Sequence, residues 1–192
     1  MAGLRIGVLT VSDGVAAGVR QDLSGARMCA GLEALGHVVA ERAVVADEQA
    51  AIAETVARWA DEVALDAVVT LGGTGLGPRD VTPEATARVI ERAVPGLAEA
   101  LRAEGAKSTQ AAYLSRGIAG VRGRTVVVNV AGSEGAARDA LATLSALLPH
   151  AAHILRGGGH EAAEGERAAR PPGRTERNES KASGGAGDGS RA

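Results

Sequence analysis

Short, continuous apolar runs alternate along this chain with segments whose apolar residues recur at helical spacing. The runs at residues 4–11 and 67–71 are long enough for buried strands and too short for free-standing helices. Between them, Ile52, Val56 and Trp59 form one stripe of a helix. Strands that alternate with helices are typical of an α/β fold, because parallel neighbouring strands need a crossover connection. We therefore expect three α/β/α layers around a mostly parallel sheet.

The remaining elements follow the same alternation. Further strands are expected at 38–45, 118–121 and 125–130, the last two as an antiparallel hairpin, with helices over 22–35, around 52–63, after residue 95 and over 137–148. Met28, Leu32 and Leu35 form the stripe of the first helix, which Gly36 ends. Another helix is expected to start at Thr82-Pro83-Glu84, with Thr82 as its N-cap.

The end of the chain has a different composition. Residues 157–192 contain no Val, Ile, Leu, Met, Cys or aromatic residue. Such a segment has too little to bury to offset the entropy lost on ordering. We expect one domain over residues 1–160 and a disordered tail over 161–192.

Composition excludes several classes of function. The 192 residues include 21 basic and 23 acidic side chains, so the net charge of −2 favours neither nucleic acid nor a membrane as partner. The single cysteine, Cys29, excludes internal disulfides and cysteine-built metal centres, and we expect it to be a small buried hydrophobe. No apolar run approaches the ~20 residues that span a bilayer. A cytoplasmic protein is the expectation.

Four segments are expected to line a ligand site. In open parallel sheets, ligands bind beyond the carboxyl ends of the strands. The segments there are Ser12-Asp13-Gly14, the turn around Asp47, residues 72–80 and Ala131-Gly132-Ser133. They consist largely of Gly, Ser, Thr and Asp, which offer backbone N–H groups, hydroxyls and carboxylates.

The run Gly72-Gly73-Thr74-Gly75-Leu76-Gly77-Pro78-Arg79-Asp80 indicates a phosphate or carboxylate cradle. Four glycines in six positions let the backbone approach an anion closely, and a helix N-terminus follows. The P-loop and dinucleotide fingerprints are both absent. A glycine-rich turn that only joins a strand to a helix is the alternative.

Three aspartates follow strands and could converge on this site: Asp13, Asp47 and Asp80. Carboxylates around a polyphosphate favour Mg²⁺, which takes one or two of them beside waters and phosphate oxygens. A single loop aspartate is more often a turn or cap residue, and this alternative applies most to Asp13.

Together, the motifs resemble the molybdopterin adenylyltransferase family over about residues 4–160. The matching stretches are RIGVLTVSD at 5–13, ADE at 46–48, GGTG at 72–75, PRDVTPEA at 78–85, LSRG at 114–117 and NVAGS at 129–133. The resemblance implies a homotrimer of α/β subunits that transfers the AMP group of MgATP to the terminal phosphate of molybdopterin and releases pyrophosphate. It also implies the molybdate-insertion protein as a further partner.

The resemblance implies a role for each matching residue. Asp47 and Asp80 would be the catalytic carboxylates and the magnesium ligands. Nucleotide and its phosphates would be bound by Ser12, Asp13, Gly72, Gly73, Thr74 and Gly75, and the pterin side by Ser115, Arg116, Gly132 and Ser133. The last loop departs from the family, since Ala131 and Glu134 stand where proline is usual. With only two lysines in the chain, Arg79, Arg116 or Arg122 must supply any positive clamp.

Two other functions are compatible with the motifs. One is a non-catalytic molybdopterin-binding or scaffolding module of the same fold. The other is an enzyme that inserts molybdate, although about 160 residues leave no room for an accessory domain. Two carboxylates beside phosphates favour the adenylyltransferase, because a pure binder does not need them.

Overall fold

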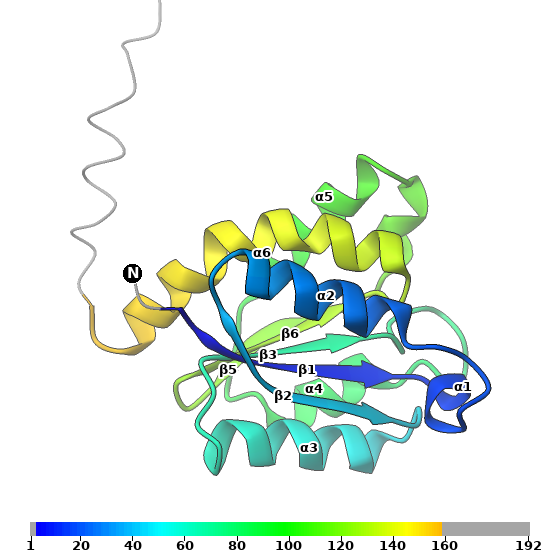
Figure 1. Ribbon diagram of the computed structural model, residues 1–192, viewed down its shortest axis with the longest axis horizontal. Coiled ribbons are helices and arrows are strands. Elements are labelled where there is room, and N and C mark those ends of the chain that lie inside the picture. The colour runs from blue at the N-terminus through cyan, green and yellow to red at the C-terminus, as the bar shows by residue number, and fades with distance from the viewer. Residues whose placement is uncertain (1–2, 159–192) are drawn as a thin grey trace, which may run out of the picture. The chain divides into compact units, whose positions relative to one another are not determined.

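The computed structural model describes residues 3–158, which form one six-stranded sheet between two layers of helices (Figure 1). The strands are β1 (Arg5–Val11), β2 (Val38–Val45), β3 (Ala67–Leu71), β4 (Arg92–Ala93), β5 (Ala119–Arg122) and β6 (Thr125–Val130). The helices are α1 (Asp13–Ala16), α2 (Leu23–Ala34), α3 (Gln49–Asp61), α4 (Thr82–Val89), α5 (Pro95–Ala106) and α6 (Glu134–Leu155), with a 3₁₀ helix, η1, at Gln110–Leu114.

The sheet brings the carboxyl ends of four strands to one edge. Its strand order is β2-β1-β3-β6-β5-β4, in which β1, β2, β3 and β6 run parallel. The hairpin partner β5 is antiparallel to β6, and β4 is antiparallel to β5. The loops after β1, β2, β3 and β6 therefore share one edge of the sheet, where the site was expected.

Each face of the sheet has its own hydrophobic core. On one face, α2, α5 and α6 pack through residues such as Met28, Leu97 and Leu144. On the other face, α3 and α4 pack through residues such as Trp59 and Val89 (Figure 1). The central strand β3 is buried along its whole length, as its uninterrupted apolar run predicted. The three-layer prediction is confirmed.

Local details differ from the sequence prediction at several points. The N-cap of α4 is Val81 rather than Thr82, whose hydroxyl is buried and donates to the Gly72 carbonyl at 2.8 Å. Leu35 is 45% exposed and lies one residue past the end of α2 at Ala34, so it is not part of the buried stripe. The short elements α1, β4 and η1 were not predicted. Cys29 is buried as expected, and desolvation raises the pKa of its thiol.

The predicted tail over 161–192, and with it the end of the 1–160 domain, lies outside the described residues. Within residues 3–158, no helix combines the length and apolarity needed to cross a bilayer.

Truncation of Leu144 on α6 should destabilise the domain far more than truncation of Leu147 on the same helix. Leu144 is fully buried, whereas Leu147 is 40% exposed. We expect Leu144→Ala to lower the free energy of unfolding by about 2–5 kcal/mol, through lost burial and the cavity that remains. Leu147→Ala should cost less than about 1 kcal/mol. Urea unfolding measures both, and equal costs would contradict the assignment of the core to this face.

Candidate active site

A cavity of about 1060 Å³ opens at the shared carboxyl edge of the sheet. All of the sequence-predicted site residues except Asp13 and Arg116 line it. The lining therefore includes Ser12, Asp47, Gly72, Gly73, Thr74, Gly75, Asp80, Ser115, Gly132 and Ser133. These residues come from four strand-ending loops and from the segment after η1, so distant parts of the chain meet there.

Close backbone packing sets the conformation of residues 72–75, which we call the glycine loop. Gly72 has φ +107°, and its N–H donates to the Val130 carbonyl at 3.0 Å. A Cβ at this position would lie 2.2 Å from the Val11 carbonyl oxygen, so only glycine fits. A Cβ at Gly132 would lie 2.9 Å from the Gly72 Cα. The loops after β3 and β6 are thus in direct contact beside the end of β1.

Asp47 and Asp80 lie against this glycine loop. A Cβ on Gly73 would be 3.1 Å from Asp47 Oδ1, and one on Gly75 would be 2.9 Å from Asp80 Oδ2. Each carboxylate is anchored through one oxygen: Asp47 Oδ2 accepts from the Asp13 N–H at 2.7 Å, and Asp80 Oδ2 accepts from the Gly77 N–H at 2.8 Å. In the part of the chain that the structure describes, these bonds leave the Oδ1 of each aspartate for a ligand.

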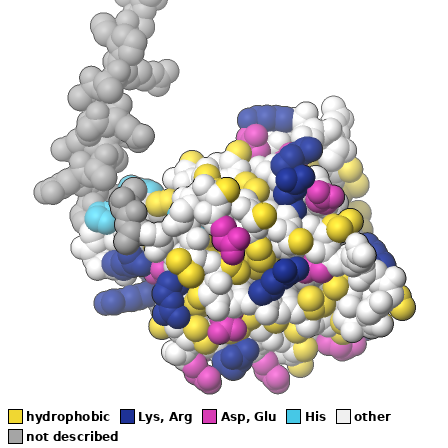
Figure 2. All heavy atoms as spheres, viewed as in Figure 1, with side chains coloured by type: hydrophobic (Ala, Val, Ile, Leu, Met, Phe, Trp, Pro, Cys, Tyr) yellow, Lys and Arg dark blue, Asp and Glu magenta, His cyan; other side chains and the backbone are white. Residues whose placement is uncertain are grey.

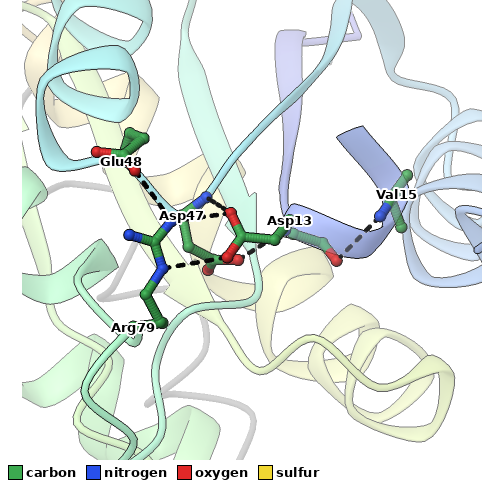
Figure 3. A network of polar contacts seen from close by, with 6 residues as sticks. Asp13, Val15, Asp47, Glu48 and Arg79 are labelled. Carbon is green, nitrogen blue, oxygen red and sulfur yellow. Dashed lines mark hydrogen bonds and ion pairs between the residues drawn. The ribbon is translucent and has the colours of Figure 1, made fainter. Parts of the chain in front are cut away.

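Asp13 is turned toward the neighbouring loops instead of the cavity (Figure 3). Its Oδ1 accepts from the Asp47 N–H at 3.0 Å, and the Arg79 guanidinium donates to both of its oxygens at 3.0 and 3.1 Å. The Arg79 bonds, and after them the Asp47 N–H, hold the pKa of Asp13 below its usual value. This geometry therefore does not favour the direct nucleotide contact that the resemblance implied for Asp13.

The Arg116 side chain does not line the cavity either, although the resemblance implied that it would contact the pterin. Its guanidinium donates to the Gly75 carbonyl at 2.7 Å, to the Asp80 carbonyl and to the Glu84 carboxylate. Its backbone N–H donates to the Thr74 carbonyl at 2.8 Å. Arg116 is absent from the cavity lining, so the structure favours a role in holding the glycine loop over contact with the pterin phosphate.

The N-terminus of α6 faces the same cavity. Ser133 caps the helix by accepting from the Ala136 N–H at 3.1 Å, and Gly135 and Ala136 line the cavity. A helix N-terminus carries partial positive charge and unpaired N–H groups, which favour a bound anion. Glu134, the acidic departure in this loop, pairs with Arg27 at 3.2 Å, and this pairing offsets part of its charge.

Three arginines that sequence reasoning missed line the cavity: Arg20, Arg102 and Arg138. Arg102 lies on α5 and donates to the Gly117 carbonyl at 2.8 Å. The hydrophobic stripes of α5 and α6 do not indicate that Arg102 and Arg138 reach the cavity. Tertiary packing sets where these helices lie beside the carboxyl ends of the strands. Arg79, Arg116 and Arg122, the clamp residues expected from the sequence, are absent from this lining, so its basic side chains are other arginines.

An α/β sheet with a glycine loop, two loop aspartates and a helix N-terminus at its carboxyl edge is of the class that binds phosphate-bearing ligands there. The family model described as a probable molybdopterin binding domain matches residues 7–150. The chain belongs to this family of molybdenum cofactor biosynthesis proteins. The resemblance inferred from the motifs is confirmed.

Similar proteins differ in length. The chain is 43% identical over 156 residues to a molybdenum cofactor biosynthesis bifunctional protein of Chlorobaculum tepidum, covering 81% of this chain and 50% of that one. It is 40% identical over 159 residues to molybdenum cofactor synthesis protein cinnamon of Drosophila melanogaster, covering 81% and 26%. It thus spans half or less of these two relatives. Over 166 residues it is 34% identical to a molybdopterin adenylyltransferase of Helicobacter pylori, covering 82% and 90%.

Solved structures of similar proteins have the same fold. A molybdopterin biosynthesis enzyme MoaB of Thermus thermophilus is 45% identical with a TM-score of 0.76, covering 80% of this chain and 97% of that one. A molybdopterin biosynthesis Mog protein of Mycobacterium ulcerans is 37% identical with a TM-score of 0.74, covering 80% and 99%.

Removal of Arg116 should raise the pKa of Glu84. The Arg116 hydrogen bonds hold this pKa below the ordinary value of 4.5. Because the folded-state pKa is lowered, the pair stabilises the loop above the ordinary carboxyl range, and this contribution is lost as the pH falls through the lowered pKa. In Arg116→Ala, NMR titration should find the Glu84 pKa shifted back toward 4.5. An unchanged pKa would show that the ion pair does not form in solution.

Proposed function

We propose that this chain transfers the AMP group of MgATP to the terminal phosphate of molybdopterin and releases pyrophosphate. One observation carries the proposal: Asp47 and Asp80, from different loops, lie against the same glycine loop in one cavity. Relatives named molybdopterin adenylyltransferase support it, including one in Helicobacter pylori that the match covers over 90% of its length.

The donor set fits magnesium held together with a nucleotide. Among residues 3–158, no group of three or more His, Cys, Asp or Glu side chains could hold a metal ion by themselves. Mg²⁺ is typically bound by one or two carboxylates with the remaining positions on waters and phosphate oxygens. Asp47 and Asp80 would supply those carboxylates through their Oδ1 atoms. When bound, the ion would neutralise charge on the phosphates.

The remaining groups of the site would align two anionic substrates. Nucleotidyl transfer needs alignment and charge neutralisation more than covalent help from the protein. Backbone N–H groups of the glycine loop and of the α6 N-terminus would bind phosphate oxygens. The attacking phosphate is already ionised at neutral pH, which is why a site built from Gly, Ser, Asp and Arg suffices. The cavity volume of about 1060 Å³ is at the upper end of the range of about 300–1,000 Å³ that is typical of small-molecule sites.

Replacement of either aspartate should abolish turnover and spare pterin binding. We expect Asp80→Asn and Asp47→Asn each to lower kcat at least about 100-fold, because each removes charge beside the reacting phosphates. Adenylylated pterin and pyrophosphate are measured with purified protein, MgATP and molybdopterin, and pterin affinity separately. Wild-type protein that binds pterin but forms no product would favour the non-catalytic binding module. Unchanged turnover in both variants would refute the roles proposed for the two carboxylates.

Gly75→Ala should impair catalysis without unfolding the domain. The added Cβ would lie 2.9 Å from Asp80 Oδ2, so the carboxylate must move while the backbone can stay. A displacement of this kind can cost about 10²-fold in rate. Gly96→Ala is the matched control, because a Cβ there meets nothing within 4 Å. Full activity of Gly75→Ala would show that the position of Asp80 is not critical.

A further inference from the structure

Asp13 and Asp47 form a reciprocal pair of hydrogen bonds. Each carboxylate accepts from the backbone N–H of the other residue, at 2.7 Å for Asp47 Oδ2 and 3.0 Å for Asp13 Oδ1 (Figure 3). The pair joins the loop after β1 to the loop after β2. The orientation of Asp47, a cavity residue, therefore depends on Asp13, which lies behind it.

Arg79 ties this pair to the glycine loop. Its Nε and Nη2 donate to the two oxygens of Asp13 at 3.1 and 3.0 Å, and Nη2 also donates to Glu48 Oε1 at 3.0 Å. The residue after it in the chain is Asp80. One guanidinium thus connects the loops after β1, β2 and β3 (Figure 3).

The negative charges of the neighbouring carboxylates explain why an arginine is needed where these loops meet. Asp13, Asp47 and Glu48 place three carboxylates on adjoining loop ends, and like charges so close together repel. The bidentate fork of an arginine matches a carboxylate and fixes its direction, which a lysine cannot do. The raised pKa of Arg79 and the lowered pKa of Asp13 agree with this geometry.

The network has little to contribute to global stability. The side chains of Arg79, Asp13 and Glu48 are 57%, 49% and 61% exposed, and exposed ion pairs stabilise a fold only weakly. Neither Arg79 nor Asp13 lines the cavity, whereas Asp47 and Asp80 do. The consequence of the network is therefore local and concerns where the two cavity aspartates lie.

We propose that Arg79 is a positioning residue that, through Asp13, holds Asp47 in register with Asp80. The expected effect of Arg79 on turnover rests on the proposed function. Hydrogen exchange at the loop amides gives a second, independent readout of its positioning role.

Kinetics of the full-length chain test the proposal. Arg79→Ala should lower kcat about 10- to 100-fold while the KM for molybdopterin changes less than about twofold, because Asp47 is misplaced and the pterin side is intact. Arg79→Lys should recover only part of the loss, since it restores charge without the fork. If Arg79 acts through Asp13, Arg79→Ala combined with Asp13→Ala should be no slower than the slower single variant. Additive losses, or a rise in KM alone, would overturn the proposal.

A matched control removes a similar ion pair elsewhere. Arg122 donates to both oxygens of Asp61 at 2.9 and 2.6 Å, at the opposite end of β5 and β6 from the cavity. Arg122→Ala should lower the thermal unfolding midpoint at least as much as Arg79→Ala, because Arg122 also donates to the Val89 carbonyl at 2.9 Å and its side chain is only 26% exposed. Turnover should stay at the wild-type level in Arg122→Ala alone. Equal turnover losses in both variants would make the effect a general one of lost stability.

Hydrogen exchange separates this proposal from the proposed function. The Asp13 and Asp47 N–H groups donate to the carboxylates of the pair, so Arg79→Ala should speed the exchange of both as resolved by NMR, and Arg122→Ala should not. If the wild-type chain forms no adenylylated product, the proposed function fails and the exchange result still decides the positioning role. Unchanged exchange at both amides in Arg79→Ala would overturn it.

Discussion

The contact of Gly72 with the end of β1 is the constraint on which the site depends. A Cβ there would lie 2.2 Å from the Val11 carbonyl oxygen and 3.8 Å from the Gly132 Cα. This packing lets the loops after β1, β3 and β6 share one small volume at the carboxyl edge. The N-terminus of α6 and the two aspartates then face one cavity, because their strands are parallel and end together.

The arginines near the site fall into two groups, those that pair with loop carboxylates and those that line the cavity. Arg79 and Arg116 pair with Asp13, Glu48 and Glu84, so they join loops to one another. The cavity itself receives other arginines and a helix N-terminus. Arg79 and Arg116 hold loop carboxylates in place. The cavity arginines instead stand beside the carboxylates of the lining, and Arg138 pairs with Asp139 at 2.8 Å. Figure 2 shows basic and acidic side chains interspersed over the visible face, as the balanced composition indicates.

The sequence was sufficient for every strand of the sheet except β4, and most of the site residues that it predicts do line the cavity. Runs such as 67–71 end abruptly at glycine, and the rule that ligands bind at carboxyl ends then selects Asp47, Asp80 and the glycine loop. The sequence was insufficient where the result depends on neighbours that only folding supplies. Arg79 meets Asp13 across 66 positions of the chain, and no local pattern encodes that pairing. The same holds for Arg116, and for Thr82, whose hydroxyl bonds to the buried Gly72 carbonyl instead of capping its helix.

In the proposed function, loops from distant parts of the chain bind a nucleoside triphosphate and its divalent ion at one edge of the sheet. Paramagnetic broadening of backbone amide signals by MnATP, added to the ¹⁵N-labelled full-length chain, tests it most directly. The amide signals of residues 72–75 and 132–133 should broaden first. The diamagnetic control, MgATP, should shift the same signals without broadening them. Broadening centred on the opposite edge of the sheet, around residues 122–125, would contradict the claim.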